Sequence, residues 1–469
     1  MQKDLMASVS GVRGVVGKSL TPELLAKYSS AFGNLCKSGE LNARPQVVLG
    51  RDSRTSGEMC RVAVLSGLLA TGCEVIDLGI CPTPTLQIAV EGLAADGGII
   101  ITASHNPIQW NGLKFIGSNG TFLSEREAEK LFDLVKNNKI IYQPWSRLGK
   151  VKSDHSWIQK HIQKILKLKY IDVKKIKRKK LKVVLDCCNG AGGTVSPGLL
   201  RALGCQVIGL YCNPDGNFAH NPEPLPENLV SLCRAVKENK ADIGFANDPD
   251  VDRLAMVSDL GIPLGEEATL ALATEFILSK KPKSKVVTNI STSCMIDDIA
   301  QKHGSKVYRT KVGEAHVVRE LKAVKGIIGG EGNGGVILPE LHYGRDALVG
   351  MALILEYLAE SEKPISDLAA DLPKYFMIKK KGRLTQNFEK NLAKLKRKYV
   401  KSRKRFGIPN GFSGEKINLI DGVRIDFEDS WIHIRKSNTE PIFRIIAEAK
   451  SEKKAKELVS EALDILGSN

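Results

Sequence analysis

One pattern of expected strands and helices occurs three times along the 469-residue chain, and it sharply limits the possible folds. In each copy, a run rich in β-branched residues leads into a helical stretch that ends at a glycine, and a second and a third run follow. Strand–helix–strand–helix–strand order predicts a parallel sheet with right-handed crossovers, so three copies predict three similar α/β domains. The first runs begin at Gln46, Lys182 and Lys285, the second follow Gly72, Gly204 and Gly304, and the third begin near Gly97, Asp242 and Lys325.

The end of the chain departs from this pattern. Beyond a basic region near Pro373, alternating sequences at 417–427 and 430–449 predict strands, and a helix is expected from about Ser451. The expected fold class is therefore α/β, with three similar domains of mixed, mostly parallel sheets and a C-terminal α+β domain around a central cleft. The expected domain ranges are 1–155, 156–257, 258–372 and 373–469.

The charge balance invites a nucleic-acid interpretation, because 69 Lys and Arg against 52 Asp and Glu give a net charge of +17. Much of the excess lies in two runs, Lys174–Lys182 and Lys394–Arg405. Neither run contains the interleaved aromatic residues of a base-stacking surface, so solvated linker and helix faces are favoured. No nucleic-acid partner is expected, although a nucleic-acid-binding protein remains a remote alternative.

The composition and the cysteines indicate a cytoplasmic protein. The chain is 42% hydrophobic and 26% charged, as globular proteins are, and no apolar run reaches the roughly 18–20 residues that cross a bilayer. The sequence starts without the apolar core of a signal peptide. Its 10 cysteines form no C-x-x-C pair, and most are expected to be reduced core residues.

The polar sequence that follows the third run of the first copy is Thr102-Ala-Ser-His-Asn-Pro107. Ligands of open α/β sheets bind beyond the carboxyl ends of the strands, so this loop and its two counterparts are expected to face one cleft. Ser104, beside His105, is a candidate nucleophile, although the glycines of a G-x-S-x-G elbow are missing. The alternative is an ordinary strand-to-helix cap. Lys114 is a candidate proton-transfer group.

The counterpart in the second copy is Asp248-Pro-Asp-Val-Asp-Arg253. Three carboxylates at alternate positions can converge on one hard cation, which suits Mg²⁺, and Arg253 can contact a phosphate. An EF-hand is disfavoured because Arg253 and Asp259 occupy the positions of its glycine and glutamate. An acidic turn without metal is the alternative.

Two further loops carry hydrogen-bonding groups. The third copy has Gly329–Gly335, in which Glu331 and Asn333 suit hydroxyl groups or an amine and the glycines permit close approach; the alternative is a tight glycine turn. Near the C-terminus, one bend gathers two arginines with neutral donors, a natural phosphate clamp, the alternative being a polar turn. The residues of this bend are Arg435, Ser437, Asn438, Thr439 and Arg444.

These four loops, in this order and at domain-scale spacing, strongly resemble those of the α-D-phosphohexomutase superfamily, over nearly the whole chain. The resemblance implies that Ser104 carries the catalytic phosphoryl group and that Lys114 is a general acid/base. His105 and Arg13, the latter in Gly11-Val-Arg-Gly14, are expected to be catalytic as well. The implied Mg²⁺ ligands are Ser104 (through its phosphate), Asp248, Asp250 and Asp252. The implied substrate-binding residues are Arg253, Gly313, Glu331, Asn333, Arg435, Ser437, Asn438, Thr439 and Arg444.

The implied reaction is an intramolecular phosphotransfer in which phospho-Ser104 converts a sugar monophosphate into a bisphosphate, which turns around and returns its other phosphate. A 1,6-bisphosphosugar of glucose or glucosamine is the expected activator, and a monomer or homodimer is expected. The GEGNGG loop with Tyr343-Gly-Arg-Asp346 resembles the archaeal-type branch, which favours glucosamine phosphate, with glucose and mannose phosphates as alternatives. A remote alternative is a haloacid-dehalogenase-like phosphatase, which the D-x-D sequence also resembles.

Overall fold

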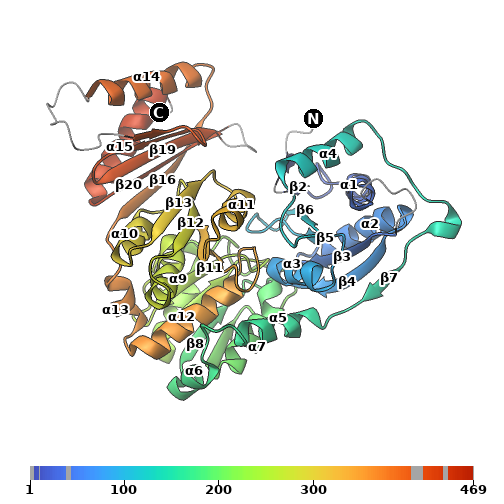
Figure 1. Cartoon of the computed structure of the whole chain (residues 1–469), viewed down its shortest axis with the longest axis horizontal. Coiled ribbons are helices and arrows are strands. Elements are labelled where there is room, and N and C mark those ends of the chain that lie inside the picture. Colours follow the sequence, from blue (N-terminus) through green and yellow to red (C-terminus); the bar gives the residue numbers. More distant parts are fainter. Residues whose placement is uncertain (1–4, 10, 38–43, 403–415, 437–441, 468–469) are drawn as a thin grey trace.

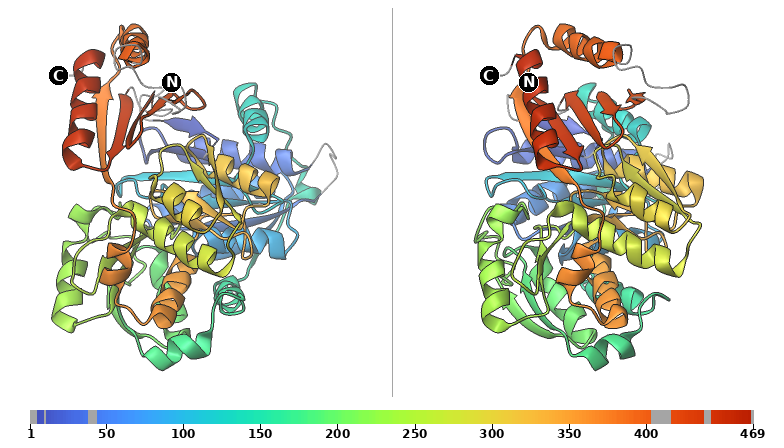
Figure 2. Two further views of the ribbon diagram at one scale, coloured as in Figure 1. Left: turned by 60° about the vertical axis from the view of Figure 1, so that its left-hand side comes forward. Right: turned by 90° about the vertical axis from the view of Figure 1, so that its left-hand side faces the viewer.

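The structure is a computed structural model, and it describes residues 5–9, 11–37, 44–402, 416–436 and 442–467, with only the backbone described at 399–402 and 416. Figure 1 shows three α/β units followed along the chain by a C-terminal unit. The ribbon of the C-terminal unit lies over the third unit in the views of Figure 2. In the part of the chain that is described, no helix is long and apolar enough to cross a membrane.

The first unit contains a seven-stranded sheet in the order β1-β2-β6-β5-β3-β4-β7. Helices α1, α2 and α4 contribute to a core on one face, and α3 packs into a different core on the other. The strands are β1 (Met6–Ser8), β2 (Gly11–Val15), β3 (Gln46–Arg51), β4 (Glu74–Ile80), β5 (Gly97–Ile101), β6 (Trp110–Gly117) and β7 (Val151–Ser153). The helices are α1 (Pro22–Cys36), α2 (Gly57–Ala70), α3 (Thr83–Gly92) and α4 (Glu125–Lys136), with a short η1 (Trp145–Arg147).

The second and third units repeat this plan with four strands each, in the orders β11-β10-β8-β9 and β13-β12-β14-β15. The second contains α5 (Trp157–Leu166), α6 (Val173–Lys179), β8 (Lys182–Asp186), η2 (Ala191–Thr194), α7 (Ser196–Ala202), β9 (Gln206–Leu210), η3 (Pro226–Asn228), α8 (Val230–Asn239), β10 (Ile243–Asn247) and β11 (Leu254–Ser258). The third contains α9 (Glu266–Lys280), β12 (Lys285–Asn289), α10 (Met295–Lys302), β13 (Lys306–Thr310), α11 (Glu314–Val324), β14 (Ile328–Glu331), β15 (Gly335–Ile337), α12 (Ala347–Ser361) and α13 (Ile365–Ala370).

The three units share one topology, which confirms the predicted repeat. In each, the first predicted strand lies between the second and the third and is parallel to both. A fourth strand, antiparallel to the third, completes the shared arrangement in every unit. The polar loops that contain Ser104 and Asp248 are therefore connections within antiparallel strand pairs. The alternative that Ser104 belongs to a strand-to-helix cap is wrong.

The C-terminal unit is a five-stranded antiparallel sheet in the order β16-β20-β19-β18-β17. Its elements are β16 (Phe376–Arg383), α14 (Phe388–Ser402), β17 (Lys416–Asn418), β18 (Val423–Asp426), β19 (Ser430–Lys436), β20 (Ile442–Ala449) and α15 (Glu452–Leu466). The predicted strands and closing helix are confirmed. The basic region near Pro373 leads into β16 and α14, which the sequence analysis did not predict as elements.

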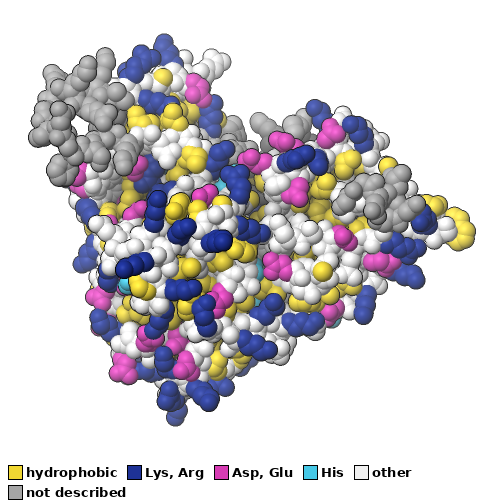
Figure 3. Space-filling model, in the orientation of Figure 1, with side chains coloured by type: hydrophobic (Ala, Val, Ile, Leu, Met, Phe, Trp, Pro, Cys, Tyr) yellow, Lys and Arg dark blue, Asp and Glu magenta, His cyan; other side chains and the backbone are white. Residues whose placement is uncertain are grey.

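The two basic runs lie mainly on helices. Part of the first run forms α6, where Lys175 pairs with Glu356 and Glu360, and Lys179 pairs with Glu362. On the face seen in Figure 3, Lys and Arg side chains are dispersed among Asp and Glu. The second run lies partly on α14 and partly outside the described residues. The arrangement of the first run agrees with a solvated helix face.

The three α/β units share one continuous hydrophobic core. It includes Leu86 of α3, Leu185 of β8 and much of α12, most of whose residues are buried. Burial around so much of its circumference makes α12 a central helix of the assembly. Six of the ten cysteines are buried, and all ten are without a disulfide partner, in line with the prediction that most are reduced.

Asp346 fixes the start of α12 and provides a stability prediction. Its carboxylate accepts hydrogen bonds from the Leu348 and Val349 amides and from Nε2 of His161 (2.9 Å) and His342 (3.2 Å). We expect Asp346→Ala to lower the free energy of unfolding by about 3 kcal/mol, since the helix loses its cap and two buried imidazoles lose their partner.

Thermal unfolding followed by circular dichroism measures this loss of stability. The control is Asp371→Ala, which removes an exposed carboxylate that pairs with Lys363 and should leave the stability unchanged. Burial raises the pKa of Asp346, but His161 and His342 outweigh it and hold the pKa well below 3.8. The ionised carboxylate of Asp346 therefore stabilises the fold at pH values above 3.8. The difference in stability between wild type and Asp346→Asn shrinks as the pH falls below that value. Equal stability of wild type and Asp346→Ala at neutral pH would contradict this assignment.

Candidate active site

The serine loop of the first unit meets the acidic loop of the second. Ser104 Oγ donates a hydrogen bond to Asp248 Oδ2 at 3.1 Å, and both side chains are buried. Ser104 has a φ of 51°, in the left-handed region that non-glycine residues rarely adopt. Its amide donates to Thr102 Oγ1 at 2.9 Å. The hydroxyl of a strained and held serine thus faces a carboxylate from another unit, as the sequence predicts for a shared cleft.

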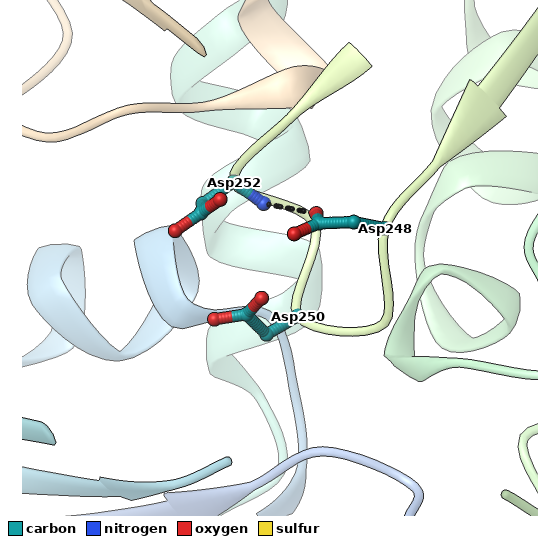
Figure 4. A group of neighbouring side chains, drawn as sticks. All are labelled: Asp248, Asp250 and Asp252. Atoms are coloured by element: carbon teal, nitrogen blue, oxygen red, sulfur yellow. Dashed lines mark hydrogen bonds between the residues drawn. The ribbon is translucent and has the colours of Figure 1, made fainter. Parts of the chain in front are cut away.

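The acidic loop can hold a metal ion. Asp248, Asp250 and Asp252 each offer a carboxylate oxygen, and these oxygens lie within 4.8 Å of one another (Figure 4). Asp248 Oδ1 is occupied by the amides of Asp252 (3.0 Å) and Arg253 (3.1 Å). Among the described residues, Asp250 Oδ1 and Asp252 Oδ1 are buried without any hydrogen-bond partner. Buried carboxylate oxygens without donors fit a hard cation such as Mg²⁺.

Cations from the other two units surround this loop. Lys114 Nζ of β6 contacts Asp250 Oδ2 at 2.5 Å and Asp252 Oδ2 at 3.2 Å. Arg345, between β15 and α12, donates to Asp252 Oδ2 at 2.6 Å. Thr83 Oγ1 adds a hydrogen bond to Asp250 Oδ2 at 2.7 Å. The loop is therefore bridged to the first and third units by charge-assisted contacts.

Burial and charge divide the carboxylates into two kinds. Burial, with Asp252 and Asp250 nearby, raises the pKa of Asp248 well above its ordinary value. Burial acts in the same direction on Asp252, but Arg345 and Lys114 outweigh it and hold the pKa of Asp252 low. Burial lowers the pKa of Lys114, yet Asp250 and Asp252 raise it by more, so Lys114 is an ammonium group in this arrangement. Of Asp248 and Asp252, Asp248 is therefore the carboxylate whose charge the protein compensates less.

The remaining basic groups predicted for the catalytic centre lie around Ser104. Arg13 Nη1 donates to Asn106 Oδ1 of the serine loop at 3.2 Å. His105 Nδ1 lies 3.4 Å from Ser104 Oγ. Burial, together with Arg253 and Arg13, lowers the pKa of His105 well below 6.5, so its imidazole is neutral at pH 7. Arg253 Nη1 lies 3.8 Å from Glu223 Oε1, which also lies 3.7 Å from His105 Nε2. Positive groups thus gather where a phosphoryl group on Ser104 would lie.

The glycine-rich loop of the third unit is held by ionic contacts. Glu331 Oε1 accepts from Asn289 Nδ2 (2.8 Å) and from the Gly313 amide (2.9 Å), and Glu331 Oε2 accepts from Arg345 Nη1 (2.9 Å). Asn333 Oδ1 accepts from the amide of Gly335 at 3.3 Å. Arg345 therefore links Glu331 to Asp252 of the acidic loop. The structure brings Gly313 and Glu331 together, as the predicted substrate-binding set requires.

Arg345 and Arg54 are functional residues that the sequence analysis missed. Arg345 binds the carboxylates of Asp252, Glu331 and Glu314 (2.9 Å), which together raise its pKa well above the usual value against the opposing effect of burial. Arg54 lies beneath the serine loop and donates to the carbonyl oxygens of Ser104 and Asn106. Arg54 follows β3 and Arg345 precedes α12, and the polar sequences Arg51-Asp-Ser-Arg54 and Tyr343-Gly-Arg-Asp346 were the available signals.

The predicted phosphate clamp is partly described. Arg435 and Arg444 are directly opposite each other on β19 and β20, and Lys381 of β16 is opposite Arg444. Paired residues share one face of a sheet, so three cations form a row across three strands. Burial lowers the pKa of Arg435, and Arg444 adds to the effect. Ser437, Asn438 and Thr439 lie outside the described residues.

The C-terminal sheet is fixed to the third unit by partly buried polar contacts. Ser291 Oγ and His433 Nδ1 are 2.8 Å apart, and the Cys294 amide donates to Glu448 Oε1 at 2.8 Å. The Val312 amide, next to Gly313, donates to Asp421 Oδ2 at 3.1 Å. In Figure 3 the molecular surface is hollowed between the C-terminal and first units. The row of cations thus belongs to a unit that contacts the third unit close to Gly313.

Three α/β units with mixed sheets, and a buried acidic loop that faces a serine, define a phosphotransfer enzyme of the phosphohexomutase fold. Family comparison matches all four domains of phosphoglucomutase/phosphomannomutase: α/β/α domains I, II and III at residues 5–140, 159–261 and 265–376, and the C-terminal domain at 380–465. The chain belongs to this family, and it is a phosphohexomutase. This assignment replaces the haloacid-dehalogenase-like alternative.

Individual relatives match over nearly their whole length. The chain is 42% identical to a "Phosphoglucomutase/phosphomannomutase" of Thermococcus kodakarensis, with 97% of each chain covered. It is 38% identical to a "Probable phosphoglucosamine mutase" of Methanopyrus kandleri, covering 97% of this chain and 96% of the relative. The crystal structure of a phosphoglucomutase/phosphomannomutase family protein from Burkholderia thailandensis superposes with a TM-score of 0.82 at 28% identity, with 99% of each chain covered.

Proposed function

We propose that this phosphohexomutase interconverts the 6- and 1-phosphates of a hexosamine or hexose, with glucosamine 6-phosphate and glucosamine 1-phosphate as the preferred pair. Ser104 carries the phosphoryl group in this proposal, and a 1,6-bisphosphosugar is both intermediate and activator. The observation that carries the proposal is the buried contact between Ser104 Oγ and Asp248. A hydroxyl beside a cation-binding cluster is the arrangement that phosphoryl transfer requires.

The residues around Ser104 have distinct parts in the proposed reaction. In the first half, the bond between phosphorus and Ser104 Oγ breaks as a sugar hydroxyl oxygen bonds to phosphorus; the hydroxyl loses a proton and Ser104 Oγ gains one. In the second half the bisphosphosugar returns its other phosphoryl group to Ser104. We assign Lys114 and His105 to the proton movements, and Arg13 and Arg253 to the charge of the phosphoryl oxygens.

Asp248, Asp250 and Asp252 are the proposed ligands of Mg²⁺, which when bound offsets negative charge on the transferring group. Lys114 and Arg345 already neutralise the other carboxylate oxygens of Asp250 and Asp252. The donor-free oxygens of these two residues are therefore available to a cation. We place the sugar against Gly313, Glu331 and Asn333, because that loop shares Arg345 with the acidic loop.

The preference for an aminosugar rests on two carboxylates of the third unit, Glu331 at the end of β14 and Glu314 at the start of α11, because an ammonium group is attracted to carboxylates. A relative named phosphoglucosamine mutase and one named phosphoglucomutase/phosphomannomutase each match 97% of this chain. A panel of glucosamine, glucose and mannose 1- and 6-phosphates, assayed with a trace of bisphosphosugar and Mg²⁺, tests the proposal. We expect the highest kcat/KM with glucosamine phosphates; a higher value with glucose or mannose phosphates would refute this preference.

The row of cations on the C-terminal sheet provides a prediction about the phosphate that is not transferred. Both isomers present a phosphate to this row, so Arg444→Ala should raise KM for the 1-phosphate and the 6-phosphate alike. A charged hydrogen bond contributes about 1.5–3 kcal/mol, which corresponds to a loss in kcat/KM of roughly ten- to hundred-fold. Arg444→Lys should restore little, because a point charge does not reproduce the guanidinium fork.

Steady-state kinetics in both directions measures this effect. Lys381→Ala is the matched comparison, because Lys381 belongs to the same row but is exposed, and we expect it to cost less. A rise in KM for only one of the two sugar phosphates would show that the row binds only one orientation of the sugar, and the assignment of the non-reacting phosphate to Arg444 would be wrong.

A further inference from the structure

Arg54 lies buried beneath the serine loop, and all three of its guanidinium nitrogens donate hydrogen bonds. Its side chain is inaccessible to solvent. Nη2 donates to the carbonyl oxygens of Ser104 and Asn106, each at 2.6 Å. Nη1 donates to those of Pro107 (2.8 Å) and Trp110 (3.0 Å). Four main-chain carbonyls, three of the serine loop and one at the start of β6, therefore converge on a single guanidinium.

The remaining nitrogen of Arg54 extends the network to Ser104 itself. Nε donates to Asp52 Oδ2 at 3.1 Å, and the same oxygen accepts from Thr102 Oγ1 at 2.6 Å. Thr102 Oγ1 in turn accepts from the Ser104 amide at 2.9 Å. Both sides of the Ser104 backbone are thus fixed, the carbonyl by Arg54 directly and the amide through Asp52 and Thr102.

The same segment contacts the unit that supplies Asp248. Ser53 Oγ donates to the Asn189 carbonyl of the second unit at 2.7 Å, and the Arg54 guanidinium lies over the Phe218 ring at 5.0 Å from its centroid. The network therefore sets the serine loop relative to its own sheet and relative to the neighbouring unit. This matters because the catalytic contact, Ser104 Oγ to Asp248, crosses that boundary.

We propose that Arg54 is a positioning residue that holds Ser104 in its left-handed conformation, with Oγ facing the acidic loop. The inference rests on the proposed role of Ser104 as phosphoryl carrier. Arginine is required because its fork supplies five N–H groups in fixed directions, one for each of the five acceptors, whereas a lysine supplies only three and cannot donate to all of them. Arg54 does not touch the sugar in this assignment, so its loss should slow transfer without weakening substrate binding.

The test compares Arg54→Lys with wild type in steady-state kinetics and in hydrogen–deuterium exchange of the 102–110 peptide. We expect kcat to fall about 100-fold, the loss that a displacement of roughly 1 Å at a reacting atom produces, while KM changes by less than about three-fold. Exchange in the 102–110 peptide should accelerate. The matched control is Arg61→Lys, which alters a different ion pair of the same unit, with Asp77, and should change neither quantity.

A second variant decides the matter if Arg54→Lys does not fold. Thr102→Val keeps the shape of a buried residue but removes the oxygen that accepts from the Ser104 amide, and we expect kcat to fall about ten-fold at unchanged KM. Wild-type kcat in a folded Arg54→Lys or Thr102→Val enzyme, or a rise in KM that accounts for the whole loss, would overturn the inference. Absence of mutase turnover in the wild type would instead refute the proposed function, and peptide exchange alone would then decide the role of Arg54.

Discussion

Ser104→Ala is expected to abolish phosphorylation of the enzyme and to reduce kcat by at least about 10⁴-fold, because removing a covalent nucleophile leaves only binding and electrostatic effects. Intact-protein mass spectrometry after incubation with a 1,6-bisphosphosugar should show one phosphoryl group on wild type and none on the variant. The fold should survive, since the substitution deletes one oxygen from a residue whose backbone is held by Arg54 and Thr102.

The matched control is Ser66→Ala, an exposed serine on α2 of the same unit, which should keep both the phosphoryl group and the turnover. Mutase activity at the wild-type level in Ser104→Ala would remove the serine from the mechanism, and with it the whole assignment of the loop. A phosphoryl group that persists in the variant would place the carrier on another residue.

The second large effect is expected for the acidic loop. Asp248→Asn, Asp250→Asn and Asp252→Asn should each lower kcat by roughly 10³-fold and weaken Mg²⁺ binding, because each removes one charge from a site built from three carboxylates. Asparagine preserves the shape of each side chain, so the loss should not follow from unfolding. Isothermal titration calorimetry with Mg²⁺ or Mn²⁺ measures binding independently of turnover.

Asp215→Asn is the control for the acidic loop, since Asp215 is an exposed carboxylate of the same unit that accepts hydrogen bonds from Asn213 and Asn217. Treatment with EDTA should abolish turnover in wild type, and added Mg²⁺ should restore it. Turnover that survives EDTA would refute the metal assignment, whereas calorimetric binding unchanged in all three variants would move the metal to other ligands.

The repeated fold could be predicted because its signals are local. Runs of β-branched residues that end at polar loops, with glycines closing the helices between them, identify the first three strands of every unit. The fourth strands were harder to find. Leu254–Ser258 and Gly335–Ile337 are short, and they pair with the strand just before them, so only a turn inside the functional loop separates the two. The polar residues of the acidic and glycine-rich loops occupy those turns, and they obscure the sequence patterns by which a hairpin turn is usually recognised.

β16 was missed for a different reason. Phe376–Arg383 contains three consecutive lysines and is an edge strand whose residues are largely exposed, so it lacks the hydrophobic alternation of a half-buried strand. Charged residues on an edge are a common protection against unwanted pairing between sheets. Its register against β20 then places Lys381 beside Arg444, a relation that no linear spacing could indicate.

The predicted site residues were those whose chemistry is visible in a short motif, such as the alternating aspartates and the serine loop. Arg54 and Arg345 act through contacts with segments about 50 to 90 residues away in sequence, at Ser104 and at Asp252. An arginine beside an aspartate looks like any surface pair until the fold shows that its guanidinium is buried. Sequence reasoning therefore selected residues with visible chemistry, several of which the structure brings together, and missed the buried arginines that contact them.

The bridging of the acidic loop by Lys114 and Arg345 has a consequence for how the chain matures. Three carboxylates cannot be withdrawn from water at acceptable cost until cations accompany them. During synthesis Lys114 is made before the aspartates, but Arg345 emerges about 90 residues after Asp252. We therefore expect the acidic loop of a nascent chain to keep part of its hydration until Arg345 of the third unit has emerged, because only then are both of its cationic partners present.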